Sequence, residues 1–394
     1  MAKIFFSVLL LGALNMFKGA NSQLGVLYSP FVTHGDDPHS TRSYSLKDVK
    51  VMLNLLQDDN FHYVSTHSVG APDEPYLAGS TINKCSSIAE TALAAAQINK
   101  EKNKLALSVY QGVSSASING QSQQKLSTEI ETAFEILQTA NKIYDGTVTG
   151  LVLDGAGFMI PPSKTPSVLN AIVKSRAMNL TFGMTLPTCK SIEAALKIEQ
   201  YHQKILDELG SFDFFICPNI PTKEDYSRGP GPFKESITKQ VLELENFLKG
   251  LGAKAQFYIE TGWASGMNSS NPYELVEQKD FWEMMGQWAN AEKRMVFMYE
   301  AFDNPWRADV TEELPYSSHY GLWKHLDNEK EYSMSSYTRK ISKIETHNAH
   351  PKENRGSGEP RNNNASGRQA TTEFNNGILV ASFGLIGYTF KLWL

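Results

Sequence analysis

The sequence predicts an α/β fold of the (β/α)8 TIM-barrel type. Short apolar segments alternate with amphipathic ones along most of the chain, and this alternation predicts eight strands separated by helices. The 394 residues are enough for one barrel, which needs about 250 residues, with a tail at each end. Two neighbouring strands in the second half of the chain also end in acidic and aromatic residues, at the edge where parallel barrels carry their sites.

The predicted strands recur at intervals that leave room for a helix after each one. In order they are 24–29, 61–67, 105–109, 148–154, 181–185, 212–217, 256–260 and 296–300. The clearest predicted helices are 46–57, the alanine-rich 86–99 and 127–143. Because strands that alternate with helices pair in parallel, this order favours a closed barrel over a two-layer open sheet.

Residues 1–22 have the layout of a secretory signal peptide. Lys3 supplies the positive charge, residues 4–14 form the apolar core, and the run Ala-Asn-Ser at 20–22 provides a small-residue cleavage site. The alternative is an N-terminal membrane anchor, but the apolar run is shorter than the roughly 20 residues that a span requires. The barrel domain is therefore predicted over residues 23–345 of a chain that enters the secretory pathway.

The C-terminal part of the chain predicts a cell-surface anchor. Residues 346–376 are rich in Asn, Gly, Ser, Pro and charge, which is typical of a disordered linker. Residues 377–394 form a short apolar tail, and a cluster of small residues at Asn364 precedes it by a polar spacer. This layout predicts a glycosylphosphatidylinositol (GPI) anchor attached at Asn364, on the outer face of the plasma membrane. A short tail-anchor helix is the alternative.

Composition and short motifs limit the remaining chemistry. Sequons make Asn179 and Asn268 candidate glycosylation sites, although such triplets also arise by chance. The three cysteines, Cys85, Cys189 and Cys217, allow at most one disulfide, lack metal-ligand spacing and are expected to be buried free thiols. A net charge of −5 without a basic stripe argues against nucleic acid binding, and no metal or cofactor is expected.

The stretch Phe-Tyr-Ile-Glu-Thr-Gly-Trp at 257–263 is the strongest indication of function. Three apolar residues lead into Glu260, and a turn with Gly262 and the aromatic Trp263 follows at once. A carboxylate at the carboxyl end of a buried strand, beside a tryptophan that stacks on a sugar ring, suits attack on an anomeric carbon. The alternative is a glutamate that accepts a helix-cap or loop hydrogen bond.

A second stretch, residues 295–307, repeats this design one helix-length downstream. Its apolar strand ends in Tyr299, Glu300 and Asp303, with Trp306 just beyond. Packing alone does not explain two consecutive strands that end in acids and aromatics. Together they indicate a site for carbohydrate.

These two stretches belong to a wider set of motifs. The others are His-Tyr-Gly-Leu-Trp at 319–323 and Tyr-Ser-Pro at 28–30, after the first strand. The set resembles family 17 glycoside hydrolases, above all the fungal cell-wall branch of β-1,3-glucanases and glucanosyltransferases, with its patterns E-T-G-W-P-S, F-E-A-F-D-E-P-W-K and H-W-G-L. Ala264 and Asn304 depart from the usual proline and second acid. The resemblance extends from about residue 24 to residue 323 and thins in the middle.

The resemblance implies cleavage or transfer of β-1,3-glucan by a retaining mechanism, with two carboxyl groups about 5–5.5 Å apart. It places Glu260 as the nucleophile. The family's acid/base is a glutamate at the end of strand four, and setting strand on strand puts Ala156 at that position. The usual proton donor is therefore missing. Asp154, two residues earlier on the same strand, is the candidate replacement, and the alternative is a structural aspartate.

Seven residues near the ends of strands are candidate substrate contacts. They are Tyr28, His67, Trp263, Tyr299, Glu300, Asp303 and Trp306. His67 stands on strand two, where the family often has an arginine. The alternative for His67 is a polar residue whose hydrogen bonds are satisfied at a strand end.

Three functions stay open on the sequence alone. The first is a cell-surface β-1,3-glucan glycosidase or transglycosidase with Glu260 as nucleophile. The second is a GPI-anchored, non-catalytic glucan-binding or adhesive protein, and the third is a barrel with no sugar ligand. Since loss of a general acid costs a factor of about 10²–10⁴ in rate, Ala156 favours impaired or absent activity. The acids and tryptophans at strand ends argue against the third function.

Overall fold

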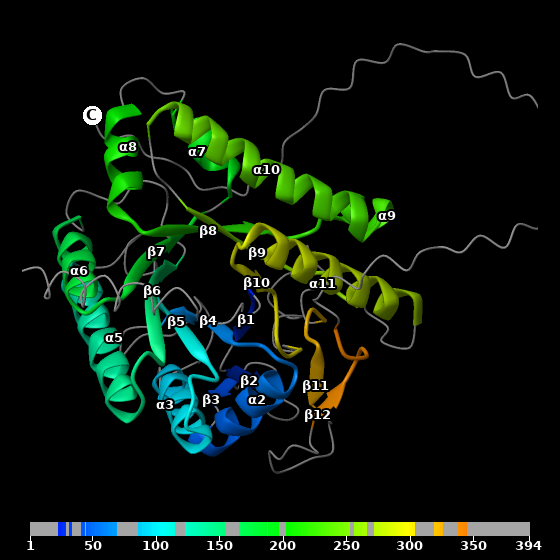
Figure 1. Ribbon diagram of the computed structural model, residues 1–394, viewed down its shortest axis with the longest axis horizontal. Helices are drawn as coiled ribbons and strands as arrows, with labels where there is room; N and C mark the ends of the chain where they lie inside the picture. Colours follow the sequence, from blue (N-terminus) through cyan, green and yellow to red (C-terminus); the bar gives the residue numbers. More distant parts are fainter. Residues whose placement is uncertain are drawn as a thin grey trace, which may run out of the picture. The chain divides into compact units, whose positions relative to one another are not determined.

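The chain folds into a closed barrel of parallel strands surrounded by helices. The computed structural model describes residues 23–28, 31–33, 41–43, 45–68, 86–114, 123–154, 165–186, 188–196, 202–252, 256–265, 272–303, 319–325 and 337–344. All of them lie in the first of the two units into which the chain divides, Met1–Asn348 and Ala349–Leu394. The predicted (β/α)8 TIM barrel is confirmed (Figure 1).

The barrel strands follow one another around the barrel in chain order. They are β1 (Leu24–Tyr28), β4 (Tyr63–Ser68), β5 (Ser108–Ser114), β6 (Val148–Asp154), β7 (Thr181–Thr185), β8 (Phe214–Asn219), β9 (Phe257–Thr261) and β10 (Val296–Met298). β1 pairs with both β4 and β10, which closes the barrel. Most strands lie close to their predicted ranges, because strands of a parallel barrel are buried on both faces and read as apolar runs. The exception is β5, which overlaps its predicted range of 105–109 only at residues 108 and 109.

Helices cover the outside of the barrel (Figure 1). They are α2 (Leu46–Asp58), α3 (Ser86–Lys102), α5 (Gln123–Ile143), α6 (Thr165–Ala177), α7 (Lys190–Leu196), α8 (His202–Ser211), α9 (Lys223–Arg228), α10 (Pro230–Gly250) and α11 (Pro272–Glu292). Reciprocal capping boxes start two of them, with Ser45 and Asp48 at α2 and with Thr222 and Asp225 at α9. The predicted helices 46–57, 86–99 and 127–143 fall within α2, α3 and α5.

Two small antiparallel sheets lie outside the barrel. One pairs β2 (Phe31–Thr33) with β3 (Thr41–Ser43), and the other pairs β11 (Trp323–His325) with β12 (Tyr337–Arg339). Neither sheet was predicted from the sequence. Three-residue strands carry too few residues for an alternating pattern to stand out.

Aromatic side chains fill the lumen of the barrel. The ring of Tyr110 on β5 lies 5.6 Å from Phe214 on β8, 6.3 Å from Tyr258 on β9 and 5.3 Å from Phe297 on β10, between centroids. Since β5 lies across the barrel from β9 in the strand order, these rings meet through the lumen. The centre of the barrel is a packed core, as expected for this fold.

Glycines on adjacent strands make room for three of these rings. The register partners are Gly25 with Phe297, Gly150 with Tyr110 and Gly183 with Phe214. A Cβ atom at Gly183 would lie 2.2 Å from the Phe214 ring, well inside van der Waals contact. The absence of a side chain at Gly183 is therefore a packing requirement of the lumen.

Replacing Gly183 with alanine is expected to lower the free energy of unfolding by about 1–3 kcal/mol, because the Phe214 ring is fixed by its neighbours and cannot yield freely. Urea denaturation of Gly183→Ala beside Gly210→Ala measures this. A Cβ at Gly210, near the end of α8, meets nothing within 4 Å, so that control should be neutral or more stable by up to about 1 kcal/mol. Equal stability of Gly183→Ala and the wild type would refute this account of the lumen.

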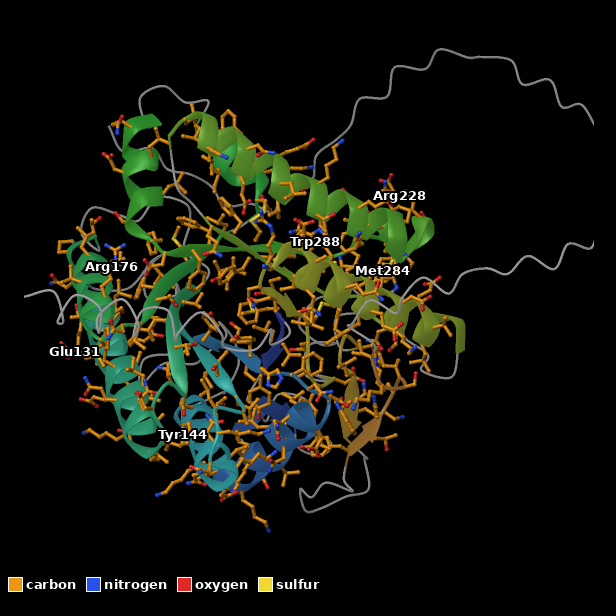
Figure 2. The ribbon with its side chains drawn as sticks, in the orientation of Figure 1. Glu131, Tyr144, Arg176, Arg228, Met284 and Trp288 are labelled. Carbon is orange, nitrogen blue, oxygen red and sulfur yellow. A yellow bond between two sulfur atoms is a disulfide. The ribbon has the colours of Figure 1, made fainter. Side chains whose placement is uncertain are left out.

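Cys189 and Cys217 form a disulfide, drawn as a yellow bond in Figure 2, with their Cα atoms 5.1 Å apart. The prediction of free thiols is wrong for this pair. β7 and β8 are neighbours, so Cys189, just before α7, comes close to Cys217 on the outward face of β8. Their separation of 28 residues in the sequence gave no sign of this proximity. Cys85 lies outside the described residues.

The predicted signal peptide, polar linker and apolar tail lie outside the described residues, so these predictions stay predictions. Among the residues that the structure does describe, no helix has the length and apolar character needed to cross a bilayer. Asn179 is exposed in the turn after α6, with a φ of 56°. Its glycosylation also stays a prediction.

Candidate active site

Glu260 lies at the carboxyl end of the barrel. Side chains alternate along β9, so Phe257 and Ile259 pack outward against the helices, whereas Tyr258 packs in the lumen. Glu260 comes two residues after Tyr258 and therefore faces the lumen, one layer nearer the mouth. It is partly exposed, while the other residues of β9 are buried. This is the position from which barrel strands present catalytic side chains.

Tyr299 is the first residue after β10, the strand beside β9, on which Glu260 lies. It is the next lumen-side residue after Phe297, and its ring lies 5.0 Å from Tyr320 in an edge-on contact. Leu27 and Ala264 complete this buried group. Tyr299 is 8% exposed. The group forms an aromatic layer between the lumen and the mouth, adjacent to the carboxylate.

Glu300 lies directly after Tyr299, and the peptide bond between the two residues is cis. Glu300 is only 1% exposed, so its carboxyl group is enclosed by protein. Its charge raises the pKa of Lys340. A buried carboxylate in the electrostatic range of a buried ammonium is suited to shaping the field of the site.

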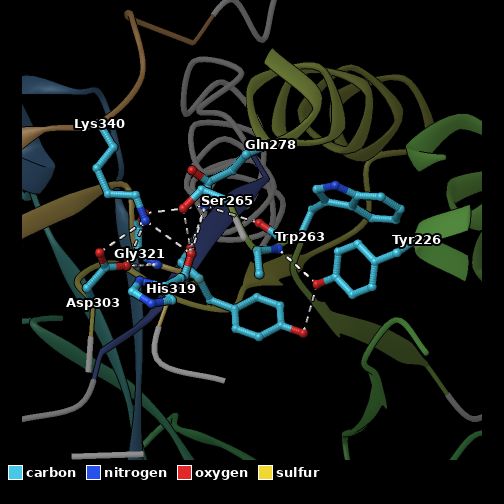
Figure 3. A network of polar contacts seen from close by, with 10 residues as sticks. Tyr226, Trp263, Ser265, Gln278, Asp303, His319, Gly321 and Lys340 are labelled. Carbon is cyan, nitrogen blue, oxygen red and sulfur yellow. Dashed lines mark hydrogen bonds and ion pairs between the residues drawn. The ribbon is translucent and has the colours of Figure 1, made fainter. Parts of the chain in front are cut away.

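Asp303 lies in an ion pair rather than at an open position (Figure 3). Lys340 Nζ donates to its two carboxylate oxygens at 2.8 and 3.1 Å, and the Gly321 N–H donates to Oδ1 at 2.9 Å. Burial raises the pKa of Asp303, and the charge of Lys340 opposes that rise. These contacts occupy the carboxylate, so the structure does not support Asp303 as a direct substrate contact.

A single amide side chain joins the segment after β9 to the turn before β11. Gln278 Nε2, from α11, donates to the carbonyl oxygens of Trp263 and Tyr320, both at 3.1 Å, and lies 3.3 Å from that of Gly321 (Figure 3). The Ser265 N–H donates to the His319 carbonyl at 3.1 Å. Main-chain groups on both sides of the site are therefore held in one arrangement.

Tyr226, from the short helix α9, closes the other side of this network (Figure 3). Its hydroxyl accepts a hydrogen bond from the Ala264 N–H at 3.1 Å and donates one to the Tyr320 hydroxyl at 3.2 Å. Its ring centroid lies 4.6 Å from that of Trp263. Tyr226 is the half-buried member of the group, which places a hydroxyl and a ring edge near the mouth.

Trp263 and Tyr28 do not lie at the mouth. Trp263 is fully buried among Tyr226, Phe233 and Phe281, on the outer side of the barrel. Tyr28 is also fully buried, and its hydroxyl lies 3.3 Å from the Met52 Sδ atom of α2. The predictions that these rings contact substrate are therefore not supported, because protein atoms already cover them.

The side chains of His67 and Asp154, on β4 and β6, lie outside the described part of the structure. Ala156, Asn268, Trp306 and Asn364 lie outside it altogether. The roles predicted for these six residues stay predictions.

Four residues that organise the site were not predicted from the sequence: Tyr226, Gln278, Tyr320 and Lys340. Tyr320 could have been predicted, since it lies inside the His-Tyr-Gly-Leu-Trp motif. Gln278 and Tyr226 stand alone on helical segments without a motif, and Lys340 comes from a three-residue strand end. Their roles follow from tertiary contacts that no local pattern encodes.

The described part of the site offers the partly exposed carboxylate of Glu260 and the half-buried hydroxyl of Tyr226, which suit hydrogen bonding to a polar ligand. Within the described residues, no group of three or more His, Cys, Asp or Glu side chains is placed to hold a metal ion.

No protein-family model and no curated protein sequence matches the chain. Its structure is similar to that of an endo-laminarinase from Formosa Hel1_33_131, with a TM-score of 0.58 and 16% identity over 77% of this chain and 84% of that one. A family 17 β-1,3-glucanosyltransferase from Rhizomucor miehei gives a TM-score of 0.49 and 12% identity over 82% and 98%. Its active-site mutant in complex with laminaritriose gives 0.48 and 16%. The laminarinase likeness shows a shared barrel fold.

Proposed function

We propose that this protein is a family 17-type glycoside hydrolase-like barrel that acts on or recognises β-1,3-glucan, with Glu260 in the nucleophile position. The main observation that supports this proposal is the position of Glu260. It faces the lumen at the carboxyl end of β9 and is the partly exposed residue of that strand. The motifs at 260–263 and 299–303 support the choice of polysaccharide, as does the barrel shared with an endo-laminarinase.

In this proposal Glu260 attacks the anomeric carbon, and the glycosidic oxygen leaves with a proton from a second group. A Glu260–glycosyl ester forms in this step, and water or a second sugar hydroxyl then releases it. Ala156 at the position of the usual acid/base makes proton delivery the weak step. Asp154 is the replacement that we propose to test. A poor leaving group such as a sugar alkoxide is then cleaved slowly, whereas binding is less affected.

The second candidate function is a non-catalytic, glucan-binding surface protein. Ala156 is the observation that favours it, because a barrel that has lost its proton donor retains its binding surface. The sequence features of residues 1–22 and 364–394 support secretion and GPI anchoring of either form at the cell surface.

Calorimetric titration with laminaritriose, a β-1,3-linked trisaccharide, tests the recognition that both candidates share. We expect binding at least about tenfold tighter than that of the β-1,4-linked cellotriose, because the two linkages orient successive rings differently. Analysis of the incubated sugar for cleavage or transfer products separates the enzyme from the binding protein. Absence of binding to either trisaccharide would contradict the proposal and favour a barrel without a sugar ligand.

A further inference from the structure

Lys340 has an almost fully enclosed, charged side chain in the network around the site. Its side chain is 2% exposed, and it comes from the segment that follows β12, far from the two predicted motifs. Besides its two contacts with Asp303, its Nζ atom donates to the His319 carbonyl at 3.1 Å. One ammonium group therefore links the segment after β10 to the turn before β11 (Figure 3).

The charges that face Lys340 come from each element packed against it. Asp303 and Glu300 follow β10 and raise its pKa, and Lys324 on β11 lowers it. The charge of His319 also lowers the pKa of Asp303. Two buried carboxylates, Asp303 and Glu300, thus lie in the electrostatic range of one buried ammonium.

Burial opposes the charged forms of both members of this ion pair. Desolvation is the largest cause of both shifts, raising the pKa of Asp303 and lowering that of Lys340. A raised carboxyl pKa means that stability is lost as the pH rises through it, and a lowered ammonium pKa means that stability is lost as the pH falls through it. Buried pairs of this kind are often replaceable by apolar residues.

A second ion pair fixes the β11–β12 sheet, which Lys340 directly follows. Arg339, the preceding residue, pairs with Asp59 at the end of α2, and the Trp323 indole N–H donates to the same carboxylate at 3.2 Å. The Lys340 N–H donates to the Leu322 carbonyl at 2.9 Å. Main-chain hydrogen bonds also join β11 to the segment after β10, from the Asp303 N–H to the Trp323 carbonyl at 2.8 Å and from the Leu322 N–H to the Ala301 carbonyl at 3.1 Å. Lys340 adds the side-chain link from this anchored sheet to the carboxylate of Asp303 and to the turn before β11.

We propose that Lys340 is a positioning residue of the site: its buried ammonium holds the segment from Glu300 to Asp303 against the turn His319–Gly321 and sets the charge of Glu300. The position of Tyr299 next to Glu260 depends on the same segment. The inference rests on the proposed function only for the identity of the sugar. The electrostatic link from Lys340 to Glu300 is independent of it.

The double variant Asp303→Asn/Lys340→Met separates positioning from folding. Asparagine keeps an oxygen that accepts the Gly321 N–H, and methionine replaces the lysine stem with a side chain of similar shape. The His319 carbonyl keeps the Ser265 N–H as donor. We expect the double variant to melt within about 3 °C of the wild type, whereas Lys340→Met alone leaves Asp303 buried without its ammonium and should melt about 10 °C lower.

The readout of function is the titration of Glu300, followed by NMR in protein labelled with ¹³C at the glutamate carboxyl carbons and assigned with Glu300→Gln. In the double variant we expect the Glu300 signal to titrate at a higher pH than in Asp303→Asn alone, because these two proteins differ only in the ammonium charge of Lys340. Laminaritriose binding should weaken about tenfold or more. Lys343→Met, an exposed lysine three residues away, is the matched control and should change neither readout.

A folded double variant in which Glu300 titrates at the same pH as in Asp303→Asn would overturn the proposal. So would an unchanged titration in Lys340→Met, if that variant alone folds. If the wild type fails to bind laminaritriose, the proposed function fails, and the Glu300 titration still decides the role of Lys340. A merely structural lysine would change the melting temperature of the single variant without moving the titration of the double variant.

Discussion

Replacing Glu260 with glutamine is expected to lower turnover of a dinitrophenyl β-laminaribioside by a factor of about 10⁴ or more, because the side chain that forms the glycosyl ester is removed. This substrate reports on the nucleophile even in a chain that lacks the usual proton donor. Dinitrophenolate leaves without a proton, so the absence of a glutamate at Ala156 does not mask the contribution of Glu260. Steady-state release of the phenolate, followed by absorbance, measures the effect.

Glu243→Gln is the matched control for this experiment. Glu243 is an exposed residue of α10 that pairs with Lys239 on the helix surface, so its loss should leave turnover unchanged. Laminaritriose binding to Glu260→Gln should persist, because stacking and hydroxyl contacts come from other groups. Retention of wild-type turnover by Glu260→Gln would remove Glu260 from the mechanism.

Replacing Gly262 with alanine is expected to destabilise the protein by about 3 kcal/mol or more and to disrupt the site at the same time. A Cβ atom at Gly262 would lie 1.9 Å from the Tyr299 carbonyl oxygen. Main chain cannot rotate away as a side chain does, so the segment with Tyr299 and Glu300 must shift. The close approach explains the glycine in the Glu-Thr-Gly-Trp motif, since Gly262 does not have a positive φ.

Two further variants sharpen this test by urea denaturation. Gly321→Ala should behave like Gly262→Ala, because its Cβ would lie 2.0 Å from the Asp303 nitrogen. Gly250→Ala, at the end of α10, has nothing within 4 Å of the added atom and should cost no stability. If Gly262→Ala unfolds at the same urea concentration as Gly250→Ala, the packing of main chain on main chain does not constrain the site.

The barrel itself could be predicted from the sequence because most of its strands contain a short apolar run and helical segments separate them. Side chains alternate between the two faces of each strand, and this alternation also predicts which residues face the lumen. Glu260 faces the lumen, so Trp263, an odd number of positions later, continues the outward row of Phe257 and Ile259. Tyr28 likewise follows Leu24 and Val26 outward. Trp263 and Tyr28 were predicted to lie at the mouth because of their residue types. The strand face that each one occupies instead points it outward.

Other parts of the site were beyond the reach of a local reading. Lys340 lies 37 positions from Asp303, and the disulfide joins residues 28 positions apart. Contacts of this kind depend on which strands and hairpins become neighbours in space. The partnership of Gly183 with Phe214 is also a matter of register between strands, which is fixed only when the barrel closes.

The most direct test of the central claim is to trap the glycosyl ester. A 2-deoxy-2-fluoro dinitrophenyl β-laminaribioside releases dinitrophenolate as the Glu260 carboxylate bonds to the anomeric carbon, and the fluorine slows release of the sugar by water. We predict that intact-protein mass spectrometry shows one added laminaribiosyl group and that peptide sequencing places it on Glu260. An adduct on another residue, or no adduct in protein that binds laminaritriose, would contradict the assignment of Glu260 as nucleophile.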